Sequence, residues 1–214
     1  IGFLILALSS CVDIWDDITI HTDGSGTYNY RVNMSASKVK INSILALDSV
    51  DGRRIPKLAE IKEKIEYYRN KLEEKQGISN VRIDSNYDDF IFKIYLDFES
   101  VADLQNGIRE IIKEEIKDKN DPVLDENWLS WDGKVLTRIV PNFQAVIQKM
   151  KAEDQEKLKK GKYTSVSRFD KPIIKCDNPQ AKISPTKTAG LIESNTYSVG
   201  TNPSVLKSTF VVSN

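Results

Sequence analysis

Between Phe90 and Phe98, large apolar side chains recur at every second position, and this segment constrains the fold more than any other. An extended chain would carry them on one face, opposite Lys93 and Asp97; the apolar set is Phe90, Phe92, Ile94, Leu96 and Phe98. Burying each such side chain stabilises a fold by roughly 1.5–3 kcal/mol, so this strand must lie at the core. The segment therefore predicts a sheet with one buried face.

Two segments beside this strand predict amphipathic helices. One runs from Pro56 to Gln76, with proline in the first turn, glycine just past the end, and apolar residues at spacings of three and four. The other follows Ser100, which forms a capping pattern with Asp103. Because this helix directly follows the strand, we expect Phe92 and Ile94 to be buried against it.

The remaining elements complete an α+β pattern. We expect a third long helix from Pro141 to Lys160 and a shorter one from Ser35 to Leu47, with hairpins over Trp15–Met34 and Trp128–Val140. Later strands are predicted at Tyr163–Phe169, Lys182–Ser184, Ala189–Glu193 and Val205–Val212. The fold class is α+β, with a mainly antiparallel sheet packed against about three amphipathic helices. We also expect an apolar groove between these helices and the sheet, as an alternative to a fully packed interior.

Composition indicates an ordinary globular body. The chain is 40% hydrophobic and 29% charged, with 31 basic and 31 acidic side chains, so no net charge would attract nucleic acid. The basic clusters Arg53–Arg54 and Lys157–Lys160 lack interleaved aromatic residues, which also argues against a nucleic-acid partner. Residues 12–214 are expected to form one domain, with a boundary near Gly161 as the alternative.

The first eleven residues, IGFLILALSSC, are an apolar run that ends in small residues and Cys11. This pattern is typical of the end of a bacterial lipoprotein signal peptide, whose cysteine becomes the acylated N-terminus. The alternatives are an ordinary cleaved signal, a membrane-spanning anchor, or a disulfide between Cys11 and Cys176. The visible run is shorter than the ~20 residues that span a bilayer. We therefore predict lipidation at Cys11 and membrane attachment through it.

The residues after Cys11 bear on the destination of such a lipoprotein. The position after Cys11 is Val12, whereas enterobacterial lipoproteins that stay at the inner membrane carry aspartate there. The resemblance to enterobacterial lipoproteins without this aspartate implies transport to the outer membrane. The acids Asp13, Asp16 and Asp17 resemble the acidic tether of surface-exposed lipoproteins of the Bacteroidota, but apolar residues interrupt them. The periplasmic face is therefore favoured over the cell surface.

No pattern of nucleophile, base and metal ligand is present in the sequence. His21 is the only histidine, which excludes a histidine-rich zinc site and a His-based triad. Cys176 has no activating pattern around it and is interpreted as an incidental thiol. We therefore expect a non-enzymatic protein without a cofactor or a metal.

Three acidic segments could suggest ion or substrate binding. Asp23–Gly26 lacks the ligands of a calcium loop and the lysine of a phosphate loop, so it is interpreted as a hairpin turn. In Asp118–Asp125, Pro122 and Val123 stand where a calcium loop needs a ligand and a glycine. The pair Asp88–Asp89 is predicted to lie in a turn without an apolar pocket, which gives little support to a glycosidase.

Short stretches of the chain resemble Bacteroidota envelope lipoproteins of unknown function. They are Gly77–Val81, Asp89–Phe92 and Leu96–Phe98. More distantly, the order of lipobox, glycine-containing hairpin ending in Met34–Ser35, helices and late strands resembles the LppM-type lipoprotein domain. That resemblance implies an α+β scaffold that binds lipids or glycolipids through an apolar groove.

Two functions follow as hypotheses. The first is a membrane-anchored, non-enzymatic envelope lipoprotein that binds an apolar ligand or a protein partner. The alternative is an accessory subunit whose charged helix, Pro56–Gln76, docks on a larger membrane machine such as a secretion or motility complex.

Overall fold

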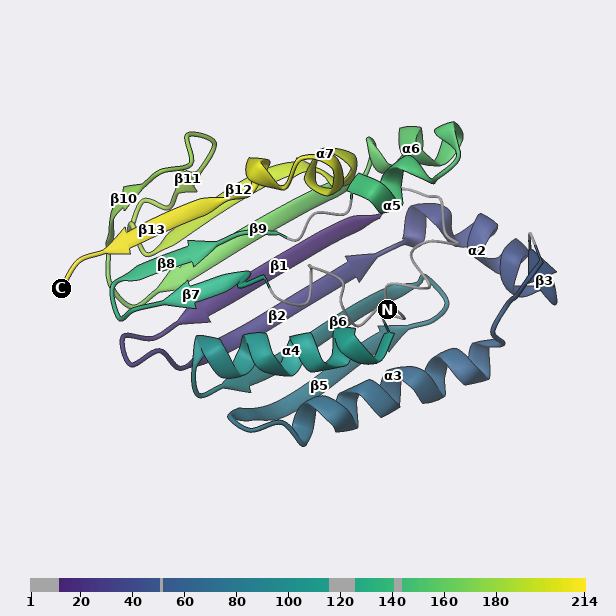
Figure 1. Ribbon diagram of the computed structural model, residues 1–214, viewed down its shortest axis with the longest axis horizontal. Coiled ribbons are helices and arrows are strands. Elements are labelled where there is room, and N and C mark those ends of the chain that lie inside the picture. The colour runs from purple at the N-terminus through teal and green to yellow at the C-terminus, as the bar shows by residue number, and fades with distance from the viewer. Residues whose placement is uncertain (1–11, 51, 116–125, 141–143) are drawn as a thin grey trace.

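The computed structural model describes residues 12–50, 52–115, 126–140 and 144–214, which form three sheets and several helices (Figure 1). The larger sheet has seven strands, and all neighbours in it are antiparallel except β1 and β9, which are parallel. Across the sheet these strands are β11 (Lys182–Ile183), β12 (Ala189–Asn195), β9 (Lys162–Phe169), β1 (Asp13–Ile20), β2 (Gly26–Asn33), β6 (Ile91–Phe98) and β5 (Ile78–Asn86). The α+β class with a mainly antiparallel sheet is confirmed.

A four-stranded antiparallel sheet packs on the part of the large sheet that contains β9 and β12. Its order is β10 (Ile173–Cys176), β13 (Ser208–Val212), β8 (Val135–Arg138) and β7 (Leu129–Trp131). The two sheets meet where the Phe210 ring crosses Gly190, at which a Cβ atom would lie 2.3 Å from the ring. Only glycine allows the strands to approach this closely. A separate ribbon pairs β3 (Ser49–Val50) with β4 (Arg53–Arg54).

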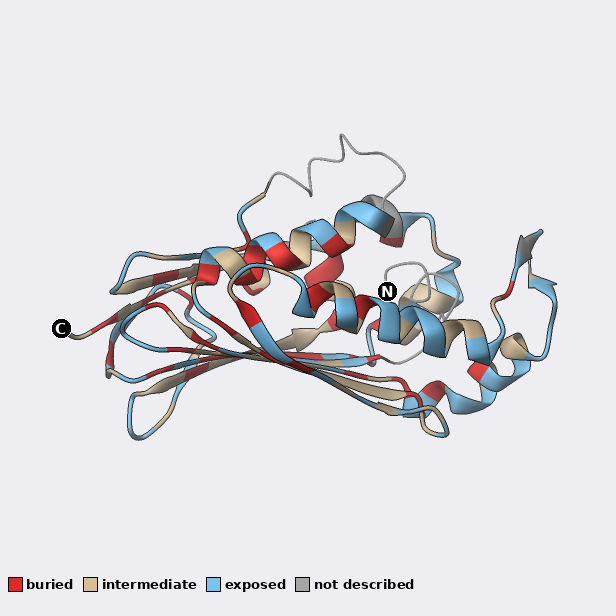
Figure 2. Ribbon diagram, turned by 90° about the horizontal axis from the view of Figure 1, so that it is seen from below, coloured by how far each residue is buried: buried red, intermediate tan, exposed pale blue. Residues whose placement is uncertain are grey.

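Two long helices cover the other part of the same sheet face (Figure 2). They are α3 (Leu58–Glu73) and α4 (Val101–Glu115), which confirm the helices predicted there. The Glu60 carboxylate accepts a hydrogen bond from the Lys57 amide at the start of α3, at 3.0 Å. Ser100 Oγ accepts one from the Asp103 amide at the start of α4, at 3.1 Å. These caps satisfy amide groups that have no partner within the helix.

The other helices are short. The predicted helix after Ser35 is a 3-10 turn (Ser35–Ser37) followed by α2 (Lys38–Leu45). The remaining ones are α5 (Gln144–Gln148), α6 (Ala152–Leu158), α7 (Thr196–Thr201) and a second 3-10 turn (Pro203–Val205).

The single helix predicted between Pro141 and Lys160 is wrong, because α5 and α6 are separated by a break. The Gln155 side chain donates to the backbone oxygens of Ile147 and Met150 across it, at 3.2 and 3.1 Å. The break therefore leaves these carbonyls satisfied. Pro141 itself lies outside the described residues.

The core consists of two clusters of buried side chains. The large one lies between the sheets and the long helices, and the small one lies where β1 begins and β2 ends. The small cluster comprises Val12, Val32, Met34, Ile41 and Phe90. Phe92 and Ile94 are half-buried, and Phe92 packs on the small cluster, so their predicted burial against α4 is wrong. Further along β6, Leu96 and Phe98 are buried in the large cluster, which also contains residues of α4.

Candidate functional site: an apolar end beside the start of β1

An apolar depression lies at the end of the molecule where β1 begins and α2 is attached (Figure 1). Its walls come from α2, the segment before α3, the first turn of α3 and the turn between β5 and β6. All its lining residues are apolar or aromatic: Ile41, Ile44, Leu45, Ile55, Pro56, Leu58, Ile61, Tyr87, Phe90 and Phe92.

Local hydrogen bonds and ion pairs bring the chain between α2 and α3 back over this depression. The Ile55 amide donates to the Asp48 carbonyl at 2.9 Å, and Lys57 Nζ pairs with the Asp48 carboxylate at 2.8 Å. Arg54 pairs with Glu60 of α3 at 2.6 Å. These contacts hold the segment against α3, and its residues Ile55 and Pro56 line the depression.

Further apolar side chains are exposed around α2. Val39, on the outward side of this helix, is 81% exposed, and Leu47 just after it is 48% exposed. Single exposed apolar residues are ordinary on a protein surface, and these two lie on and just after the helix that lines the depression. We call the depression together with Val39 and Leu47 the apolar end.

The described chain starts beside the apolar end. Val12 is 2% exposed and belongs to the same small cluster as Ile41 and Phe90, both of which line the depression. The Lys162 amide fixes the next residue by donating to the Asp13 carboxylate at 2.9 Å.

The depression is small. Its cavity volume is about 30 Å³, enough for only a few water molecules. Pockets that enclose a small molecule typically measure ~300 Å³ or more. The elongated groove predicted between helices and sheet is therefore wrong for the described residues in this conformation, and the apolar end offers a surface rather than an enclosed chamber.

The predicted lipidation site, Cys11, and the acidic segment Asp118–Asp125 lie outside the described residues. His21 is exposed, and its Nδ1 lies 3.0 Å from a carboxylate oxygen of Asp170, in a pair that links two loops. Burial raises the pKa of the Cys176 thiol, so it stays protonated and a poor nucleophile near neutral pH.

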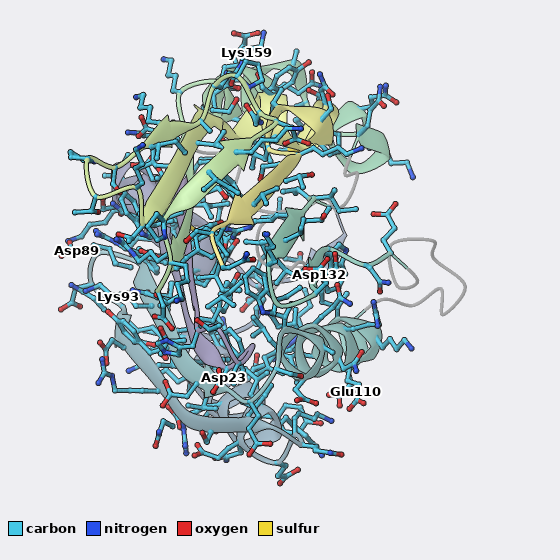
Figure 3. The ribbon with its side chains drawn as sticks, turned by 90° about the vertical axis from the view of Figure 1, so that its left-hand side faces the viewer. Asp23, Asp89, Lys93, Glu110, Asp132 and Lys159 are labelled. Atoms are coloured by element: carbon cyan, nitrogen blue, oxygen red, sulfur yellow. The ribbon has the colours of Figure 1, made fainter. Side chains whose placement is uncertain are left out.

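The acidic turns have structural partners. Asp23 accepts hydrogen bonds from the Ser25 hydroxyl and amide, at 2.7 and 3.0 Å, and these bonds lower the pKa of Asp23. Asp89 pairs with Lys38 at 3.0 Å, and its backbone amide donates to Asn86 Oδ1 at 2.9 Å. Asp23, Asp89, Glu110 and Asp132 lie apart on different elements (Figure 3). Among the described residues, no group of three or more histidine, cysteine, aspartate or glutamate side chains could hold a metal ion.

A buried polar cluster between the two sheets was not predicted. Arg138 of β8 pairs with Asp16 of β1 at 2.5 Å, and Tyr163 donates to the same carboxylate at 2.8 Å. Burial, and then the charge of Asp16, raises the pKa of Tyr163 well above its ordinary value of 10.0. The signal was present in the sequence, because Asp16 stands between Ile14 and Ile18 at an inward position of an alternating strand. The cluster is committed to internal contacts and joins the sheets.

No family model and no curated protein matches this chain. A solved structure, the NMR structure of the folded domain of LppM from Mycobacterium tuberculosis, is similar with a TM-score of 0.47 and 10% sequence identity. The likeness covers 96% of this chain and 92% of that chain. In the described ranges, the helices are all too short or too polar to cross a bilayer.

Proposed function

We propose that this chain is a membrane-anchored, non-enzymatic lipoprotein of the bacterial envelope whose apolar end lies on the bilayer. The observation that carries the proposal is the position of Val12, which is buried in the small cluster beside the apolar end and stands one residue after Cys11. Consecutive Cα atoms are about 3.8 Å apart, so acyl chains on Cys11 would begin within one residue of this surface. A tether this short leaves the apolar end facing the lipid.

Bilayer contact gives the exposed apolar residues a physical role. Each methylene group buried in lipid contributes ~0.8 kcal/mol, and interfacial helices bury their apolar side chains at the boundary between headgroups and acyl chains. Val39 and Leu47 on and after α2 are placed for such a contact. In this proposal the apolar end contacts the bilayer as a surface, since the depression, at about 30 Å³, is far too small to enclose a ligand.

The charges of α3 favour this function over the alternative of a subunit that docks through that helix. Arg69 pairs with Glu66 at 2.9 Å and with Glu73 at 3.5 Å, and Lys71 pairs with Glu74 at 3.5 Å. A helix face whose charges compensate one another offers a partner little electrostatic attraction. The proposed location is the periplasmic face of the outer membrane.

The test is Cys11→Ser in the native host, with Cys176→Ser as the matched control. We expect the wild-type protein and the control to sediment with outer-membrane fractions and to carry lipid on the mature N-terminal cysteine by mass spectrometry. The Cys11→Ser protein should lose both properties. A mature chain that begins elsewhere, or unchanged sedimentation of Cys11→Ser, would contradict the proposal.

A further inference from the structure

The chain from Lys149 to Lys162 carries a surplus of positive charge at the end of the molecule where α2 lies (Figure 1). It comprises α6 and its flanking residues, and we call it the basic segment. The segment contains six lysines and three acids. The lysines are Lys149, Lys151, Lys157, Lys159, Lys160 and Lys162, and the acids are Glu153, Asp154 and Glu156.

The three acids of the basic segment are all paired with lysines. Glu153 and Glu156 pair with lysines three or four residues further along the chain. Asp154 pairs with Lys40 of α2 at 3.3 Å. The acids of the segment can therefore compensate at most half of its lysines.

Acids of neighbouring elements do not remove the surplus. Glu193 of β12 lies between two lysines, Lys162 and Lys182, and pairs with both. The Asp13 carboxylate accepts a hydrogen bond from the Lys162 amide at 2.9 Å. When these two acids are counted together with Lys40 and Lys182, eight lysines stand against five acids. The surface around α6 therefore keeps its positive charge.

Two of the lysines are available to a negative charge from outside. Lys149 and Lys160 are exposed, and within the residues that the structure describes they form no ion pair and no side-chain hydrogen bond. Lys159 Nζ lies 5.1 Å from the centre of the Tyr197 ring of α7, and Figure 3 shows Lys159 at the outer edge of the molecule. Tyrosine presents an apolar ring with a polar tip and is frequent at the membrane–water interface.

The basic segment lies directly beside the start of β1 and beside the apolar end. A Cβ atom at Gly161 would lie 2.4 Å from the Val12 carbonyl oxygen, so the two backbones are in contact there. The ion pair between Asp154 and Lys40 joins α6 to α2, the helix that lines the depression. The lysines of α6 and the apolar residues of α2 are therefore neighbours at one end of the molecule.

We propose that the basic segment binds the headgroups of anionic phospholipids in the leaflet that the apolar end contacts, with Lys149 and Lys160 supplying uncompensated charge. The inference rests on the proposed function, since it needs the apolar end to lie on the bilayer. A bilayer presents anionic groups directly above acyl chains, and positive charge next to exposed apolar residues matches that arrangement. A nucleic acid or a soluble acidic protein would match only the charge. Each lysine close to an anionic leaflet strengthens binding roughly fivefold.

The test uses the chain from residue 11 with Cys11→Ser, which contains every described residue and carries no lipid. Co-sedimentation measures its binding to vesicles of equal parts phosphatidylglycerol and phosphatidylcholine, and to vesicles of phosphatidylcholine alone. We expect binding to the anionic vesicles to be at least about tenfold tighter at about 0.1 M salt. This preference should disappear at ~1 M salt, where the screening length falls to about 3 Å. Lys149→Gln/Lys160→Gln should weaken binding to the anionic vesicles roughly 25-fold, because the contributions of two lysines are removed.

Lys171→Gln/Lys175→Gln is the matched control. It removes the same charge at and just before β10, at the opposite end of the molecule (Figure 1), and should bind the anionic vesicles like the parent protein. Equal binding to the two kinds of vesicle, or equal losses in the two double variants, would overturn the proposal. Preference for an equally charged single-stranded DNA over the anionic vesicles would overturn it as well. Acylation of Cys11 plays no part in this test, so failure of the lipid anchor and failure of the basic segment are distinguishable.

Discussion

At the scale of single residues, the buried ion pair of Asp16 and Arg138 is expected to stabilise the contact between the two sheets. Arg138→Met should lower the free energy of unfolding by ~3–5 kcal/mol, because it leaves the Asp16 carboxylate buried without its charge partner. Urea unfolding followed by circular dichroism measures this change. Arg168→Met removes a more exposed ion pair with Asp17 and should cost less than ~1 kcal/mol. Equal losses in the two variants would show that the pair does not join the sheets.

At the scale of elements, the contact between the two sheets depends on Gly190 of β12. Gly190→Ala should destabilise the protein by ~1–3 kcal/mol, because its Cβ atom would lie 2.3 Å from the Phe210 ring, which is 1% exposed and cannot move aside. Adding Phe210→Leu to the Gly190→Ala variant should restore part of the lost melting temperature, because the smaller side chain leaves space for the new Cβ atom. A Gly190→Ala protein with an unchanged melting temperature would mean that the sheets lie further apart.

The elements also show which local patterns were sufficient for prediction. Strand β6 and the helices α3 and α4 follow from regular apolar spacing, from Pro56 and Gly77 at the ends of α3, and from the cap at Ser100. The break between α5 and α6 does not, because the Gln155 side chain that satisfies its carbonyls acts through tertiary geometry. Strand β10, which was not predicted, owes its existence to pairing with β13.

At the scale of the whole molecule, the arrangement of strands could not be read from local patterns. β1 and β9 pair in parallel, with Ile14 opposite Tyr163. Strands that precede and follow Gly161 in the sequence therefore belong to the same sheet. Nothing near either strand specifies this partner, because the pairing depends on the completed core. The apolar end is likewise assembled from distant segments, so the sequence predicted apolar faces but not that they would leave only a shallow depression.

The orientation proposed for the whole molecule can be tested with two labelled variants. In a Cys176→Ser background, the variants Val39→Cys and Ile174→Cys are each labelled with a polarity-sensitive dye. Val39 is 81% exposed at the apolar end, and Ile174 is 62% exposed on β10 at the opposite end (Figure 1). When the acylated full chain is reconstituted in vesicles, emission from position 39 should shift to the blue, because the short tether holds α2 against the lipid. Emission from the dye at position 174 should remain at the wavelength typical of water. In the control, the same two labelled variants carry Cys11→Ser and are measured in detergent-free buffer, where both dyes should emit as in water. Equal shifts at the two positions would mean that the body does not rest on its apolar end, even if the anchor itself is present.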